Sequence, residues 1–206
     1  MKIRFLVTGG TFDKEYNELT GALFFKDTHV REMLRLGRCN LGLEIRTLMM
    51  IDSTEMSDLD REMFLKSCTE TSPERIVISH GTDTMSETAR YLGERVKDRT
   101  IVLTGAMVPY TFGSSDGLFN LGSALAFVQT LPHGVYVVMN GRCFDWHDVK
   151  KNRSTGHFEK DEGQVAQLPP PERRRCAPGS RRTATCPTLA LQPVSAPPPA
   201  PANGSG

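Results

Sequence analysis

The chain lacks several features that would point to particular classes of protein. It has no run of about 18 apolar residues, so the sequence predicts no transmembrane helix. Its 25 Lys and Arg residues are balanced by 24 Asp and Glu residues, which leaves a formal net charge of +1. Such a balance gives neither nucleic acid nor an anionic membrane an electrostatic attraction. We therefore expect no nucleic-acid partner and no membrane association.

Cysteine is scarce and shows no paired spacing. The 206 residues include five cysteines, which are far apart and form no CxxC motif. An odd number at wide spacing is typical of reduced thiols and argues against a disulfide framework or a structural zinc site. His147 and His157 share no helical register, so they do not suggest a metal site either. Since Lys2 and Arg4 interrupt the first apolar residues, the N-terminus resembles a strand more than a signal peptide. We expect a cytoplasmic protein without a metal.

The composition changes near residue 161. Residues 161–206 hold 10 of the 13 prolines and contain no Phe, Tyr, Trp, Ile or Met. Such a segment cannot bury enough apolar surface to offset its ordering entropy. Its two arginine clusters, 173–175 and 181–182, are interpreted as solvated charge, with a nucleic-acid or localisation patch as the alternative. The sequence thus predicts one domain over 1–160 and a Pro/Arg-rich disordered tail over 161–206, which is native or a fusion, splice or frameshift product.

The first 160 residues alternate between two kinds of pattern. β-rich apolar runs occupy 3–7, 43–49, 75–79, 101–104 and 135–139. Segments with helical spacing occupy 27–37, 58–69, 84–97 and 116–130. This alternation predicts an α/β fold with a parallel sheet covered by helices. Ligands of such sheets bind beyond the carboxyl ends of the strands, so the residues there are the candidates for a site.

Several polar groups follow the predicted strands. The segments to inspect are TGGT (8–11), DSTE (52–55), HGTDT (80–84), GAM (105–107) and NG (140–141), which bring several hydroxyls and the acid Asp83 to one edge of the sheet. A hydroxyl is a weak nucleophile unless a base takes its proton. A lysine held neutral by burial can be that base, and Lys150 and Lys151 both follow the last strand. An acid such as Asp83 can orient or tune the lysine.

Each of these elements also has a structural interpretation. TGGT is compatible with a tight turn whose glycines adopt positive φ. Thr84 and Glu87 have the spacing of a capping box, and Asp116 precedes the last predicted helix as an N-cap would. Lys150 and Lys151 fit a solvated loop pair, and His80 fits a buried histidine better than a ligand.

Six segments together resemble the bacterial-type L-asparaginases over about residues 3–158. They are TGGTFDK (8–14), DSTEMSD (52–58), HGTDTMSETA (80–89), LTGAMVP (103–109), SSDGLFNL (114–121) and VYVVMNGRCFDWHDVKKN (135–152). The resemblance implies the N-terminal domain of that family, a flavodoxin- or Rossmann-like α/β fold with helices on both faces of a parallel sheet. Long members of the family carry a second, C-terminal domain, and this chain has the Pro-rich segment in its place. The chain is therefore expected to be a short one-domain or truncated form.

The resemblance also implies catalytic roles. Thr11 matches the threonine that accepts the acyl group. Thr82, Lys151 and Asp83 match a hydroxyl–lysine–carboxylate set that relays the proton. Tyr16 is expected to be the tyrosine of a mobile loop, although the local spacing differs from that of the long enzymes.

Substrate contacts are implied in the same way. Ser53 matches a serine that holds the substrate α-carboxylate, Asp83 would also meet the α-ammonium, and Ala106 matches a backbone contact near the scissile amide.

The implied reaction is hydrolysis of the side-chain amide of L-asparagine to L-aspartate and ammonia through a threonine acyl-enzyme, with minor glutaminase activity. No metal or organic cofactor is expected, and a homodimer is implied by resemblance only. The alternatives are an inactive truncated domain that binds amino acids or a partner, and an amidase subunit of an amidotransferase.

Overall fold

The computed structural model describes residues 1–70 and 72–161. The described residues all belong to one compact unit within Met1–Leu168. The predicted disorder of the tail lies, except for residue 161, outside the described residues, as do both arginine clusters. No helix within the described ranges combines the length and the apolar character needed to cross a membrane.

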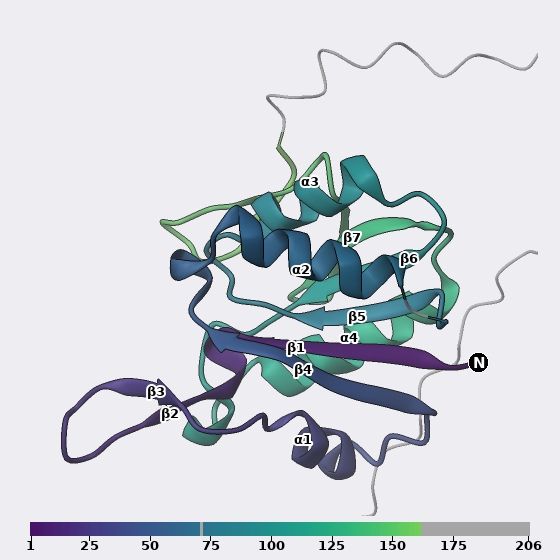
Figure 1. Cartoon of the computed structure of the whole chain (residues 1–206). Coiled ribbons are helices and arrows are strands. Elements are labelled where there is room, and N and C mark those ends of the chain that lie inside the picture. The colour runs from purple at the N-terminus through teal and green to yellow at the C-terminus, as the bar shows by residue number, and fades with distance from the viewer. Residues whose placement is uncertain (71, 162–206) are drawn as a thin grey trace, which may run out of the picture. The chain divides into compact units, whose positions relative to one another are not determined.

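A six-stranded sheet in the order β4-β1-β5-β6-β7-β8 forms the centre of the fold (Figure 1). Its strands are β1 (Ile3–Gly9), β4 (Leu43–Ile51), β5 (Arg75–Ser79), β6 (Thr100–Thr104), β7 (Gly134–Met139) and β8 (Arg142–Asp145). The first five pair in parallel, so their carboxyl ends lie along one edge of the sheet. The five predicted strands are confirmed, each within two residues at its ends.

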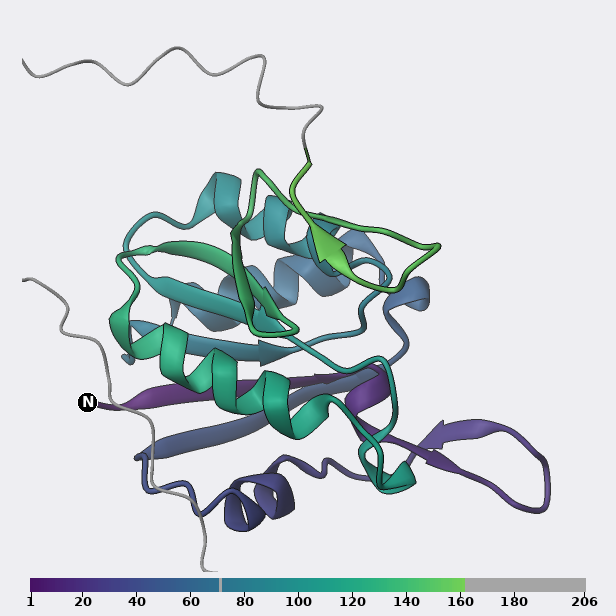
Figure 2. The same cartoon turned by 180° about the vertical axis from the view of Figure 1, so that it is seen from behind.

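Helices cover both faces of the sheet (Figures 1 and 2). Ile76 and Ile78 of β5 pack with residues of α2 (Asp58–Thr69) and α3 (Met85–Arg95). Val77, which points to the opposite face, packs with α1 (Val30–Leu36) and α4 (Gly117–Thr130). Successive side chains of a strand alternate between faces, so an all-apolar strand is required where both faces are covered. The predicted fold class is confirmed.

The structure adds short elements that the sequence pattern did not predict. β2 (Lys14–Tyr16) and β3 (Leu23–Phe25) form an antiparallel hairpin, and β9 (Lys150–Lys151) pairs with β10 (Phe158–Glu159). β8 runs antiparallel to β7, so the sheet is mainly and not wholly parallel. Strands of two to four residues contain too few positions for a period of two to be visible.

Candidate active site

Four loops at the carboxyl edge of the sheet meet at the backbone of His80 and Gly81, which directly follow β5. A Cβ at Gly10 would lie 2.4 Å from the Gly81 nitrogen, and a Cβ at Gly81 would lie 2.4 Å from Ser53 Oγ. A Cβ at Gly105 would lie 2.3 Å from the His80 oxygen. Glycine is therefore required at three positions because the loops are in direct contact. The site is built by these close approaches.

The TGGT segment spans the end of β1, a bend at Gly10 and the start of a 3-10 helix, and it places Thr11 next to this junction. Gly10 has φ +82° and donates its N–H to the Ile51 carbonyl at 3.3 Å. Thr11 begins the 3-10 helix η1 (Thr11–Asp13) and is partly buried. The turn interpretation and the site interpretation are thus compatible, since the contact of Gly10 with Gly81 brings the backbones next to Thr11 and Thr82 together.

Three of the predicted catalytic residues are in direct contact. Lys151 Nζ donates to Thr82 Oγ1 at 2.7 Å and to Asp83 Oδ1 at 2.9 Å. The lysine side chain is 10% exposed and the Asp83 side chain 47% exposed. Lys150 instead lies 3.8 Å from carboxylate oxygens of Glu159 and Asp161. Of the two candidate lysines, Lys151 is the one that meets the predicted hydroxyl and carboxylate.

Ser53 lies in the loop after β4. It begins the 3-10 helix η2 (Ser53–Glu55) and is only 1% exposed. Its hydroxyl oxygen lies against Gly81, and its carbonyl accepts a hydrogen bond from Thr84 Oγ1 at 2.8 Å. Ser53 is therefore held against the residues that follow β5.

The loop that carries Ala106 is held by two residues for which the sequence motifs predicted no such role. Asp116 accepts a hydrogen bond from the Met107 N–H at 2.9 Å. Asn120 donates to Asp116 Oδ2 at 2.8 Å and to the Gly105 carbonyl at 2.9 Å. Ala106 is fully buried. The SDGLFN segment contained the signal, because its Asp and Asn are four residues apart on one helix face.

Thr84 and Asp116 occupy the predicted N-cap positions, but neither makes the predicted side-chain capping hydrogen bond. The hydroxyl of Thr84 precedes α3 but makes no capping hydrogen bond, because it donates to Ser53 O instead. The carboxylate of Asp116 also makes no capping bond. Ser115 Oγ accepts the Gly117 N–H in its place, at 2.9 Å. In each case the side chain at the N-cap position contacts a neighbouring loop and not the helix N-terminus.

Tyr16 lies apart from the group formed by Lys151, Thr82 and Asp83. It belongs to β2 of the hairpin, is 57% exposed and lines a shallow hollow with neighbours from the hairpin and from the 3-10 helix η3 (Tyr110–Phe112). Within residues 1–70 and 72–161, no hydrogen bond joins Tyr16 to another predicted catalytic residue. Its role in a mobile loop stays a prediction.

The base of the hairpin is tied to the body of the domain by charged side chains. Lys14 forms an ion pair with Asp52, the residue before Ser53. Although partial burial opposes it, hydrogen bonds from Lys14 and Thr54 lower the pKa of Asp52 to about 2. Asp13 is fully buried and accepts hydrogen bonds from the His29 N–H at 2.8 Å and the Thr28 hydroxyl at 3.1 Å. Burial nevertheless raises the pKa of Asp13.

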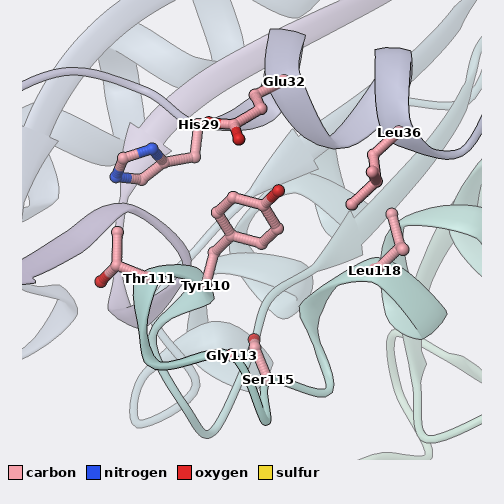
Figure 3. A pocket seen from close by; sticks show the side chains of 8 residues that line it. All are labelled: His29, Glu32, Leu36, Tyr110, Thr111, Gly113, Ser115 and Leu118. Atoms are coloured by element: carbon pink, nitrogen blue, oxygen red, sulfur yellow. The ribbon is translucent and has the colours of Figure 1, made fainter.

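A second hollow lies beside η3, between α1 and the start of α4 (Figure 3). The Tyr110 ring stands at its centre with Glu32 on one side and Leu36 and Leu118 on another (Figure 3). Burial, followed by the charge of Glu32, raises the pKa of the Tyr110 hydroxyl. The hollow has a polar and an apolar wall, and none of the predicted catalytic residues lines it.

Fold and site together define an α/β domain with hydroxyls, a lysine and a carboxylate at the carboxyl edge of a mainly parallel sheet. The family model "Asparaginase, N-terminal" matches residues 2–167. The chain belongs to this family, as the sequence motifs predicted.

Individual relatives agree with this assignment. The chain is 30% identical to an L-asparaginase from Thermococcus kodakarensis over 161 residues, which are 76% of this chain and 49% of that protein. It is 48% identical to L-asparaginase 2 of Escherichia coli over 83 residues, which are 38% of this chain and 24% of that protein.

Solved structures give the same result. The thermostable L-asparaginase from Thermococcus kodakarensis superposes with a TM-score of 0.69 at 29% identity, covering 78% of this chain and 51% of that one. A protein described as "Probable Cytoplasmic L-asparaginase", from Campylobacter jejuni, gives 0.66 at 29% identity, covering 78% and 53%. The chain thus spans about half the length of these relatives, or less.

Proposed function

We propose that this chain hydrolyses the side-chain amide of L-asparagine to L-aspartate and ammonia. The observation that carries the proposal is the contact of Lys151 Nζ with Thr82 Oγ1 and Asp83 Oδ1, at 2.7 and 2.9 Å, beside the junction of Gly10 with Gly81. The relatives are named L-asparaginases, or glutaminase-asparaginases in other cases, which supports an amide substrate and minor activity on glutamine. A carboxylate, an amine and hydroxyls at one edge suit acyl transfer.

In the proposed reaction the Thr11 hydroxyl oxygen attacks the side-chain amide carbon. As that bond forms, the Thr11 hydroxyl proton moves to Thr82 Oγ1 while Thr82 passes its own proton to the amine of Lys151, which acts as the base, and Asp83 holds the lysine in place. The bond between that carbon and its nitrogen breaks, and the nitrogen leaves as ammonia with the transferred proton. Water then cleaves the ester, which releases aspartate and restores Thr11. An oriented base of this kind raises the rate roughly 10²-fold to 10⁴-fold.

Substrate recognition in this proposal uses Ser53 for the α-carboxylate, Asp83 for the α-ammonium and the backbone at Ala106 near the scissile amide. The half-exposed carboxylate of Asp83 is consistent with a group that meets a ligand cation. Tyr16, on the exposed hairpin, is proposed to close over the substrate. The cysteine pattern favours the cytoplasm as the compartment, and a homodimer stays a prediction.

The decisive experiment is an ammonia-release assay on the full 206-residue chain over a range of asparagine and glutamine concentrations. Thr11→Ala is expected to lower ammonia release by at least about 10³-fold, because the acyl acceptor is lost. Thr11→Ser is the matched control, since it keeps a hydroxyl and should keep measurable turnover.

Two results would contradict the proposal. A folded chain that releases no ammonia from millimolar asparagine would support the alternative of an inactive domain that binds amino acids or a partner. Unchanged turnover in Thr11→Ala would reject Thr11 as the nucleophile. Circular dichroism of each variant separates a loss of chemistry from a loss of fold.

A further inference from the structure

A buried histidine lies directly behind the proposed active site and takes no part in the proposed reaction. His80 is fully buried, and its ring stands edge-on to Phe64 with 5.9 Å between the ring centroids. It precedes Gly81, where the strand-end loops meet, and its own N–H donates to the Thr104 carbonyl at 2.8 Å. Both its backbone and its ring are therefore held in place.

The contacts of the ring determine its tautomer. Nδ1 lies 2.7 Å from the carbonyl oxygen of Gly81, which can only accept, so Nδ1 carries the proton. Nε2 lies 2.9 Å from the Thr88 hydroxyl. Burial lowers the pKa of His80 to about 4, so the ring is neutral near pH 7 and Nε2 is an acceptor. The Thr88 hydroxyl must then donate to Nε2.

The direction of this hydrogen bond is reinforced from the far side of Thr88. Arg61 Nε donates to Thr88 Oγ1 at 3.3 Å, so the oxygen is engaged as an acceptor and its proton remains for His80. The guanidinium group is itself held by Asp58 at 2.9 Å and by Glu87 at 3.3 Å. The hydrogen bonds run in one direction, from Arg61 through Thr88 and His80 to the carbonyl of Gly81.

We propose that His80, oriented by Thr88 and Arg61, is a positioning residue that fixes the peptide group between Gly81 and Thr82. The two ends of a trans peptide are rigidly linked, so a carbonyl held against the imidazole fixes the direction of the Thr82 N–H. It also fixes the start of the Thr82 side chain, whose hydroxyl meets Lys151. This inference rests on the proposed function, because Thr82 is the group that is positioned.

A packing role and a positioning role make different predictions. A histidine that only fills space would be replaced with similar loss by any side chain of similar size, in proportion to the loss of stability. A histidine that positions the peptide depends on its donor at Nδ1. An amide nitrogen of Asn can take the place of Nδ1, whereas that of Gln takes the place of Nε2.

The first test compares His80→Asn with His80→Gln in the full chain. His80→Gln loses the donor to Gly81 and is expected to lower kcat for asparagine by about 10-fold to 100-fold, with KM little changed. His80→Asn keeps the donor and should retain most of kcat. The proposal would be overturned if both variants lost kcat equally and the losses were in proportion to their losses of stability, as measured by their urea midpoints.

A second pair avoids changing the histidine, in case its variants fail to fold. Thr88→Val keeps the shape but removes the proton donated to Nε2, and kcat should fall by about 10-fold. Thr88→Ser keeps the hydroxyl and should have a kcat close to that of the wild type. Wild-type kcat in Thr88→Val, or equal losses in both variants, would contradict the proposal.

A measurement without substrate separates this inference from the proposed function. Nitrogen NMR of the full chain near pH 7 should show His80 with a protonated Nδ1 and a bare Nε2, and Thr88→Val should shift the Thr82 backbone resonances. A ring protonated at Nε2 would overturn the positioning role whatever the activity. An inactive chain that shows the expected tautomer and shift would overturn the proposed function and leave the positioning of Thr82 standing.

Discussion

At the scale of single residues, the ion pair of Lys14 with Asp52 joins the hairpin to the loop that carries Ser53. The side chains are 18% and 28% exposed, so solvent screens the pair only in part. Asp52 also accepts the Thr54 N–H at 2.9 Å, which orders the start of η2. One carboxylate therefore supports two segments of the site.

Asp52→Asn is expected to lower the free energy of unfolding by about 1 kcal/mol near neutral pH, because a partly exposed pair contributes little more. The pKa of Asp52 is about 2 in the folded chain and 3.8 for a free carboxyl. A carboxylate with a lowered pKa stabilises the folded state fully at pH values above its pKa in the unfolded chain. This stabilisation is lost as the pH falls through its pKa in the folded chain.

The difference in free energy of unfolding between wild type and variant, measured with urea, should thus be constant from about pH 7 to about pH 5 and should be smaller near about pH 3. Asp98→Asn is the control, since its carboxylate is 74% exposed and lies 3.9 Å from Arg99. A difference that stays constant down to pH of about 3 would contradict the assignment.

At the scale of elements, α4 holds the loop after β6 through side chains near its N-terminus. Asn120 is fully buried, donates to Gly105 and Asp116, and accepts the Asn140 N–H at 2.9 Å. It therefore connects the loops after β6 and β7 to one helix. Breaking such a buried network leaves several polar groups without partners.

Asn120→Ala should lower the free energy of unfolding by about 2–4 kcal/mol, as measured by urea denaturation. Gln129→Ala on the same helix is the matched control, because its amide bonds to Leu125 O of its own helix. The control should change stability by no more than about 0.5 kcal/mol. Equal effects of the two variants would show that Asn120 does not connect the loops as described.

At the scale of the whole molecule, residues 1–70 and 72–161 already contain an extensive buried core. Its two apolar clusters extend from Ile3 to Phe158, one on each face of the sheet. Both clusters thus end before residue 162, where the described part of the chain ends. We therefore expect a chain of residues 1–168 and the full chain to have the same free energy of unfolding, within about 0.5 kcal/mol, and similar urea midpoints. A clearly lower midpoint for the shorter chain would mean that later residues stabilise the fold.

The motifs of the site could be predicted because most of them are local. TGGT, HGTD and TGAM directly follow apolar runs, and the ends of parallel strands meet by geometry. Asp116 was harder to place, because a carboxylate before a helix has the same sequence pattern whether it caps the helix or accepts from a distant loop. Its bonds to Met107 and Val108 depend on how α4 packs on β6.

The sequence by itself determined the order and type of the main elements, because the spacing of apolar residues is set by which side of each element is buried. The residue pattern alone left Lys150 and Lys151 open and the family resemblance named Lys151, whereas the contact of Lys151 with Thr82 depends on the tertiary structure, because adjacent residues of β9 point to opposite sides and β9 pairs with β10. The same holds for His80: the sequence favours burial, whereas its tautomer follows from contacts with Gly81 and Thr88.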